Sequence, residues 1–134
     1  MPLTFWSFRL TIACLRIAPY TFNAGLLRTG SILSTVSTTC AATIAQALKS
    51  NDLPEFDVPF APAYKGISFA AITGVSLHEQ HKIPVGFAYN RKVVKDHGEG
   101  GKMVGVPVMG KRIVVVDDVS TFGKIARIGI EAVR

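Results

Sequence analysis

The sequence predicts an α/β fold with a mainly parallel sheet, from three observations. Short apolar segments alternate with longer segments of helical spacing, the pattern of strands joined by helices. Residues 113–116 are four consecutive β-branched apolar residues, as in a strand buried on both faces of a parallel sheet. Two adjacent carboxylates, Asp117 and Asp118, then precede a small polar loop and a helix-compatible tail at 125–134. This is the layout of a ligand site at the carboxyl end of a parallel strand.

The composition predicts one globular domain over residues 1–134, with a core at 16–134 and a divergent segment at 1–15. Hydrophobic residues make up 49% of the chain and charged residues 18%, which excludes a disordered chain. The net charge of +6 admits nucleic acid, a membrane surface or small anions as partners. The basic residues gather in 91–102 without interleaved aromatic side chains, so small polyanions are favoured over nucleic acid.

Cysteine usage and the amino-terminal segment predict a soluble, cytoplasmic protein. Cys14 and Cys40 are far apart and match no metal-binding spacing, so no protein-held metal is expected. The apolar start is interrupted by Arg9 and Arg16 and lacks a basic lead-in. Because no run approaches the apolar length of a membrane span, we expect no membrane partner.

In the first half of the chain, the pattern predicts a strand followed by a long helix. Residues 16–25 are Pro-punctuated and alternate enough for a strand. From about Gly30 to Lys49, apolar residues recur near helical spacing. The turn-rich residues 50–52 should end this helix.

The second half predicts three further strands, a helix and a charged loop before the strand at 113–116. Residues 56–60 are a short strand, weakened by Pro59, which lacks a ladder donor. A helix is expected at 67–79 and a strand at 85–89. Residues 90–102 are polar, charged and Gly-rich, which predicts an exposed mobile loop. Residues 104–108 should form a strand or hairpin arm.

The charged loop has a functional and a structural interpretation. Arg91, Lys92 and Lys95 could pair with phosphate oxygens, and glycines would let the loop close over a ligand. His97 beside these cations could donate to a phosphate. The alternative is an ordinary solvated loop. The acidic pair likewise either serves neighbouring hydroxyls or a metal-bound diol of a ligand, or it caps a helix or marks a turn.

Four motifs in sequence order carry a resemblance to one family. The strand and acidic pair at 113–124 resemble the phosphoribosyl-diphosphate (PRPP) loop of the type I phosphoribosyltransferases. Residues 90–101, Asn-Arg-Lys followed by Lys-Asp-His-Gly-Glu-Gly-Gly, resemble the catalytic loop of orotate phosphoribosyltransferases. Residues 60–67 and 16–25 are similar to two further motifs of those enzymes, and together the four cover nearly everything from Arg16 onward.

The resemblance implies a type I phosphoribosyltransferase fold that transfers ribose 5-phosphate from PRPP to orotate, giving orotidine 5′-monophosphate and pyrophosphate in pyrimidine biosynthesis. It also implies Mg²⁺ carried mainly on PRPP, and a homodimer in which the catalytic loop is shared between subunits. The implied catalytic residues are Arg91, Lys92, Lys95, His97 and Asp117. The implied substrate-binding residues are Tyr64 and Lys65 for the pyrophosphate end, Asp117 and Asp118 for the ribose, Thr121 and Gly123 for the 5′-phosphate, and Phe22 for orotate.

The chain also departs from the family pattern. Phe122 stands where the family has a small residue, and Ala13–Leu15 replaces a Lys-Ser-Gly segment. The family continues with further sheet structure, so the fold is expected to be incomplete on its carboxyl side. The alternatives are therefore a non-catalytic PRPP-binding or regulatory relative and an inactive truncated fragment.

Overall fold

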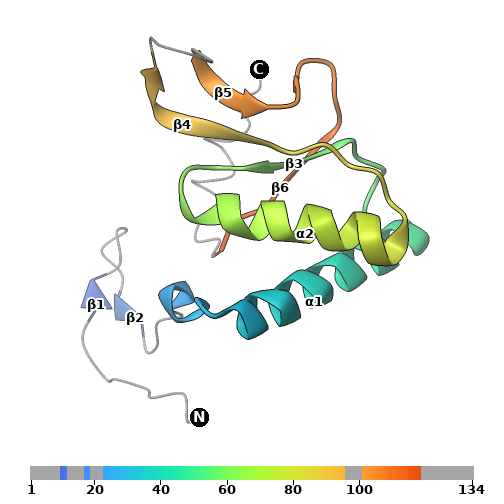
Figure 1. The fold of residues 1–134 in the computed structure, drawn as a ribbon, viewed down its shortest axis with the longest axis horizontal. Coiled ribbons are helices and arrows are strands. Elements are labelled where there is room, and N and C mark those ends of the chain that lie inside the picture. The colour runs from blue at the N-terminus through green and yellow to red at the C-terminus, as the bar shows by residue number, and fades with distance from the viewer. Residues whose placement is uncertain (1–9, 12–16, 19–22, 96–100, 119–134) are drawn as a thin grey trace.

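The computed structural model describes residues 10–11, 17–18, 23–95 and 101–118 (Figure 1). Its elements follow in the order β1 (Leu10–Thr11), β2 (Ile17–Ala18), the 3₁₀ helix η1 (Ala24–Leu26), α1 (Gly30–Lys49), β3 (Val58–Ala61), α2 (Lys65–His81), β4 (Ala88–Lys95), β5 (Gly101–Gly105) and β6 (Ile113–Val115). The predicted tail helix at 125–134 lies outside the described residues.

The main sheet has the strand order β5-β4-β3-β6, and it confirms the predicted α/β fold. β3 is parallel to both β4 and β6, whereas β4 and β5 are antiparallel. Phe60 lies opposite Ala88 on one side and Val115 on the other. β3 and β6 therefore end at the same edge of the sheet, and β4 continues beyond that edge.

Two helices are layered on the sheet, with α2 between the sheet and α1 (Figure 1). The predicted bounds of α1 are confirmed. The helix begins after Thr29, whose side chain accepts the N–H of Ile32 at 3.4 Å, and it ends at Ser50. α2 is longer than predicted and ends where Lys82 adopts a left-handed conformation with φ 57°.

By length and composition alone α1 could cross a membrane, since it has 20 residues and contains an 18-residue window with a mean hydropathy of 1.2. The expectation that no segment reaches that apolar length was therefore wrong. In the structure α1 packs along α2, and its buried residues are the small Ser37, Ala41 and Ala45. These residues recur every four positions, so one stripe of α1 faces α2 while the opposite stripe faces away.

Pro59 lies in a central strand, although proline in a sheet is usually confined to edges. Val58 donates its N–H to Arg112 on the β6 side, and Phe60 accepts from Val116 on the same side. Pro59 alternates with them and faces the β4 side, one residue before the pair Phe60–Ala88 that opens the β3–β4 ladder. The N–H of Gly86 donates to the carbonyl of Asp57 at 2.9 Å on this side, so the donor that Pro59 lacks falls at the start of the contact between β3 and β4.

The loop predicted at 90–102 was wrong for most of its length. Residues 90–95 continue β4, and residues 101–105 form β5, so most of the predicted loop at 90–102 is a β-hairpin. Charged side chains are compatible with a strand here because the hairpin extends past the sheet edge, where solvent solvates them. Residues 96–100 lie outside the described part. Within 16–25, the described residues confirm strand structure at Ile17–Ala18, and Asn23 caps the 3₁₀ helix that begins at Ala24.

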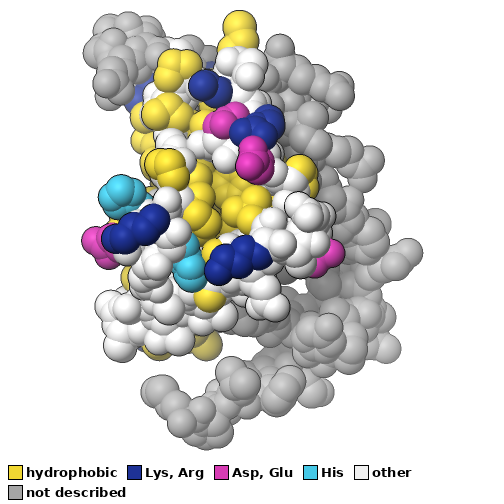
Figure 2. Space-filling model, turned by 90° about the vertical axis from the view of Figure 1, so that its right-hand side faces the viewer, with side chains coloured by type: hydrophobic (Ala, Val, Ile, Leu, Met, Phe, Trp, Pro, Cys, Tyr) yellow, Lys and Arg dark blue, Asp and Glu magenta, His cyan; other side chains and the backbone are white. Residues whose placement is uncertain are grey.

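The hydrophobic core lies around β3. Val58 and Phe60 are buried together with Ala88, and Met103, Val108, Ile113 and Val115 pack partly buried against them. β6 was expected to be buried on both faces, but its residues are only partly buried. Among the described strands β6 is an edge, so one flank of it lacks a neighbour there. Figure 2 shows hydrophobic side chains bordered by charged ones on the face where both helices end.

An ionic cluster joins the starts of β3 and β6. The guanidinium of Arg112 donates to Asp57 Oδ1 at 3.2 Å and to Glu55 Oε2 at 3.1 Å, and the backbone N–H of Arg112 donates to Asp57 Oδ2 at 2.9 Å. The backbone of Arg112 in turn accepts from the N–H groups of Asp57 and Val58. The hydrogen bonds from Arg112 lower the pKa of Asp57 below its ordinary 3.8.

We predict that Arg112→Met lowers the thermal unfolding midpoint at pH 7 by a few degrees. The lowered pKa of Asp57 means that this stabilisation is present above about pH 4 and is lost as pH falls through the folded-state value. The midpoints of variant and parent should therefore converge toward pH 2. Arg28→Met removes an exposed guanidinium elsewhere in the chain and is the control. A difference in unfolding midpoint between variant and parent that does not change with pH would contradict a role for the ionised Asp57.

Candidate functional site

The site lies at the edge of the sheet where the parallel strands β3 and β6 end and β4 continues outward. Residues 62–65 follow β3, residues 116–118 follow β6, and residues 90–92 belong to the outer part of β4. Since ligands bind outside the carboxyl ends of parallel strands, this edge is where the fold offers a binding site.

The first part of the site is the short connection from β3 to α2. Only residues 62–64 separate the two elements, so Lys65 already begins the helix. α2 has no side-chain cap and no acidic residue in its first turn. Its N-terminal N–H groups and helix dipole therefore favour an anion. The side chain of Lys65 is 70% exposed and adds a positive charge beside them.

The second part is the acidic pair after β6. Asp118 Oδ2 lies 3.6 Å from Lys65 Nζ and the Asp118 side chain is only 12% exposed. Asp117 Oδ1 accepts the backbone N–H of Asp118 at 2.9 Å. The strand end is held in place because Val116 N–H donates to Phe60 carbonyl at 2.9 Å. A cationic and an acidic side chain therefore lie close together at this edge.

Gly66 allows α2 to lie directly against the acidic pair. A Cβ atom on Gly66 would be 2.5 Å from the carbonyl oxygen of Val116 and 3.3 Å from Asp117 Oδ1. Both distances are below ordinary van der Waals contact, and the first involves backbone that cannot rotate away. Glycine is required here by a close approach, which brings the amino end of α2 to the two carboxylates.

Burial raises the pKa of the Asp117 carboxyl above its ordinary 3.8, and the negative charge of Asp118 acts in the same direction. The hydrogen bond from the Asp118 N–H and the charge of Lys65 oppose this rise. Two adjacent carboxylates in a partly dehydrated position are thus held at a cost in stability. Such groups are typical of functional sites.

The third part is the basic outer half of β4. Lys92 Nζ lies 4.8 Å from the centroid of the Tyr64 ring, a cation–π distance. Arg91 Nη1 donates to the carbonyl of Gly101 in β5 at 3.4 Å. Asn90 is buried, and its Oδ1 accepts the N–H of Ala63 at 2.9 Å. β4 therefore contacts the β3–α2 connection through two side chains, those of Asn90 and Lys92.

The structure brings together five of the residues assigned from the sequence: Tyr64, Lys65, Lys92, Asp117 and Asp118. Arg91 lies next along β4, directed at Gly101. Lys95 ends β4, and only its backbone belongs to the described part. The roles of His97, Thr121, Gly123 and Phe22 remain predictions because these residues lie outside the described residues.

The donor set suits an ion that arrives on a ligand more than one held by the protein. Among the described residues, no three His, Cys, Asp or Glu side chains gather. Asp117 and Asp118 supply the hard oxygen ligands that Mg²⁺ prefers. Lys65 lies close to Asp118, so a dedicated cage for a cation is not formed here.

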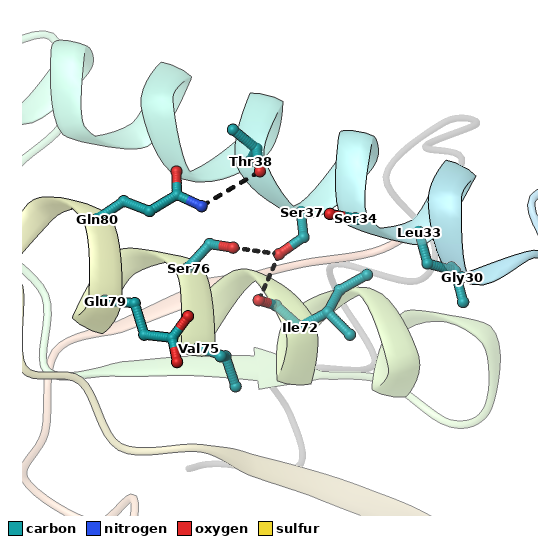
Figure 3. A pocket seen from close by; sticks show the side chains of 10 residues that line it. All are labelled: Gly30, Leu33, Ser34, Ser37, Thr38, Ile72, Val75, Ser76, Glu79 and Gln80. Atoms are coloured by element: carbon teal, nitrogen blue, oxygen red, sulfur yellow. Dashed lines mark hydrogen bonds between the residues drawn. The ribbon is translucent and has the colours of Figure 1, made fainter.

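A groove of about 350 Å³ runs between α1 and α2, away from this edge (Figure 3). Ser37 donates to the carbonyl of Ile72 at 2.6 Å and accepts from the hydroxyl of Ser76, and Gln80 donates to Thr38 at 3.2 Å. These hydrogen bonds join the two helices. None of the predicted site residues lines the groove.

Two contributors to the site had no role assigned from the sequence. Asn90 is the first residue of a motif whose later members are cations, and nothing in its sequence position distinguishes it from them. Gly66 could have been found, because an isolated glycine at a helix start signals a close backbone approach.

Comparisons with known proteins identify relatives for most of the chain. No protein-family model matches it. The chain is 49% identical over 112 residues to orotate phosphoribosyltransferase of Pseudomonas putida (strain W619), covering 84% of this chain and 50% of that protein. It is 46% identical over 134 residues to orotate phosphoribosyltransferase of Bordetella avium, covering 57% of that protein. The chain thus spans about half the length of the curated relatives it matches.

A solved structure agrees with the sequence relatives. Orotate phosphoribosyltransferase of Francisella tularensis superposes with a TM-score of 0.71 at 33% identity, covering 96% of this chain and 56% of that one. A nearly complete superposition at this level confirms the type I phosphoribosyltransferase fold.

We predict that Gly66→Ala destabilises the chain by about 1–3 kcal/mol, because the new Cβ forces α2 away from Val116. Gly74→Ala in the same helix is the control. Its Cβ would meet Val85 at an ordinary 3.9 Å, so it should stabilise the chain by about 0.5–1 kcal/mol. Urea unfolding measures both. Equal increases in the free energy of unfolding for Gly66→Ala and Gly74→Ala would contradict the close approach of α2 to Val116.

We also predict that Asp117→Asn raises the thermal midpoint at pH 7. The raised pKa of Asp117 means that the folded parent loses stability as pH rises from about 4 through the folded-state value. Asparagine does not ionise and keeps the oxygen that accepts from Asp118. The difference between variant and parent should therefore shrink toward pH 4. Asp52→Asn, at an exposed position in the turn after α1, controls for the change in net charge.

Proposed function

We propose that this chain, which is related in sequence to the orotate phosphoribosyltransferases and has their type I fold, transfers ribose 5-phosphate from PRPP to orotate. The products would be orotidine 5′-monophosphate and pyrophosphate, a step of pyrimidine synthesis. The chain spans about half of its curated relatives, so activity, substrates and partners are assigned here as a proposal.

The observation that carries the proposal is the division of charge at the sheet edge. Lys65, Lys92 and the amino end of α2 form an anion-binding side. Asp117 and Asp118 form an acidic side that accepts hydrogen bonds from hydroxyls. PRPP has the same division, with pyrophosphate at C1 and two free hydroxyls on the adjacent ribose carbons. Lys65, 3.6 Å from Asp118, lies where the two sides meet.

The charge pattern also suits the transfer step. The bond between C1 of the ribose and the pyrophosphate oxygen breaks, and a bond from C1 to the orotate nitrogen forms. As this happens, positive charge develops on the ribose ring and negative charge on the departing pyrophosphate. Lys65 and Lys92 would stabilise the leaving group, and the carboxylates of Asp117 and Asp118 would hold the ribose. Fixed charges of this kind contribute most where charge develops.

Mg²⁺ would enter with PRPP, and Asp117 and Asp118 are the described residues able to contact it. When bound, it would neutralise charge on the pyrophosphate oxygens.

Several parts of the proposal rest on the sequence motifs alone. Lys95 and His97 would join Arg91 in binding pyrophosphate, Thr121 and Gly123 would contact the 5′-phosphate, and Phe22 would contact orotate. The same resemblance implies a homodimer that shares the catalytic loop between subunits. The cytoplasmic location rests on the cysteine usage and the amino-terminal segment.

The test is the fall in orotate ultraviolet absorbance when PRPP and Mg²⁺ are added to purified protein. We expect consumption that requires both, with Lys65→Ala and Lys95→Ala each losing about 10²-fold or more in kcat/KM. Lys111→Ala removes an exposed cation away from the edge and should retain the parent rate.

Consumption that survives both lysine substitutions would contradict the assignment of the site. Protein that is folded, binds PRPP and leaves orotate untouched would instead be a non-catalytic PRPP binder. Calorimetric titration with PRPP separates that outcome from loss of the site altogether.

A further inference from the structure

Asn90 is a buried polar side chain at the point where β4 leaves the sheet. It is 4% exposed and lies directly before the two cations Arg91 and Lys92. Its backbone pairs with Met103 of β5, so the ladder fixes its position. A buried side-chain amide requires a partner, and Asn90 Oδ1 has one in the N–H of Ala63, 2.9 Å away.

Ala63 is the middle residue of the connection between β3 and α2. The next residue, Tyr64, carries the ring under Lys92, and the one after it, Lys65, reaches Asp118 at 3.6 Å. In so short a connection, a change in the backbone at Ala63 displaces both of these side chains. A hydrogen bond to this N–H therefore controls where two groups of the site lie.

The hydrogen bond also joins two parts of the site that are distant in sequence, since Ala63 and Asn90 are 27 residues apart. The contact of Lys92 with Tyr64 spans the same gap through exposed side chains, where solvent weakens it. The Asn90 contact is partly buried, so its geometry is the more strongly fixed of the two.

We propose that Asn90 is a positioning residue, which holds the backbone of Ala63 so that Lys65 stays oriented toward the pyrophosphate of PRPP. The inference rests on the proposed function for its ligand. It assigns Asn90 no contact with substrate. If the role of Asn90 were purely structural, its substitution would lower stability, and its effect on pyrophosphate affinity would not depend on whether Lys65 is present.

A double-mutant cycle on pyrophosphate affinity separates these roles. Asn90→Leu keeps the branched shape and removes the acceptor, and Lys65→Ala removes the positioned charge. Calorimetric titration with magnesium pyrophosphate should show roughly fivefold weaker binding for Asn90→Leu and about tenfold for Lys65→Ala. If Asn90 acts through Lys65, the double variant stays near tenfold. A loss of about fiftyfold, the product of the two, would overturn the proposal.

Ser37→Ala is the matched control. It removes buried hydrogen bonds to Ile72 and Ser76 between α1 and α2, away from the sheet edge. It should lower the unfolding midpoint while leaving pyrophosphate affinity within about twofold of the parent. A comparable loss of affinity in this control would show that general destabilisation explains the effect of Asn90→Leu, and would also overturn the proposal.

If the parent protein binds no pyrophosphate, the proposed function fails. Amide hydrogen exchange at Ala63 then tests separately whether Asn90 holds this part of the backbone. Asn90→Leu should exchange the Ala63 proton about tenfold faster, with α1 amides unchanged. Asn90→Asp retains an acceptor oxygen and should keep Ala63 protected. If Asn90→Leu does not fold, Asn90→Ser, whose hydroxyl is too short to reach, replaces it. If the Ala63 N–H exchanges at the same rate in variants with and without an acceptor at position 90, the inference is overturned.

Discussion

The close approach of α2 to the end of β6 is the constraint on which the rest of the site depends. Gly66 has no Cβ, so the first turn of α2 lies against the carbonyl of Val116 and the side chain of Asp117. Any larger residue would separate the helix from the strand end. With the helix in this position, Lys65 reaches Asp118 and the amino end of α2 faces the same space as the acidic pair. A glycine without chemistry of its own thus determines the spacing between the charged groups.

This arrangement has an electrostatic cost, which explains why Lys65 lies where it does. Burial and the charge of Asp118 raise the pKa of Asp117, so the ionised pair opposes folding at neutral pH. Lys65 acts in the opposite direction on Asp117 and lies 3.6 Å from Asp118. In the proposed function, the hydroxyls of PRPP would donate to the carboxylates and its pyrophosphate would bind Lys65. The ligand would then supply partners for charged groups that are only partly paired in the free protein, which is a source of binding energy.

Much of the fold could be predicted from the sequence because local pattern and tertiary environment agree there. The β-branched run at 113–115 and the helical spacing at 30–49 correspond to β6 and α1. The charged, Gly-rich composition of residues 90–102 favours a loop, whereas antiparallel pairing makes residues 90–95 part of a strand. Their antiparallel partner lies at 101–105, and the one buried side chain among the described side chains of 90–93, that of Asn90, directly precedes charged residues. In the site, Lys65 and Asp118 could be expected together because both follow parallel strands. Gly66 signals a close backbone approach, but which atoms it meets depends on the depth at which α2 packs. The partner of Asn90 depends on how the β3–α2 connection lies against β4, which no local pattern encodes.

Binding of PRPP and transfer to orotate place different demands on the chain. The described edge supplies groups for the pyrophosphate and the ribose hydroxyls, from β3, β4 and β6 together. The residues assigned to orotate and to the 5′-phosphate lie outside the described part, and so do His97 and the side chain of Lys95. Affinity for pyrophosphate and PRPP is therefore the property that follows most directly from this geometry, whereas transfer also requires the base to be held against C1. Asn90 joins the β3–α2 connection to β4 by a hydrogen bond, and Gly66 lets the start of α2 lie against the end of β6. A change in any one of these three strands should therefore alter the affinity for pyrophosphate directly. It should alter the rate of transfer as a consequence of that change in affinity.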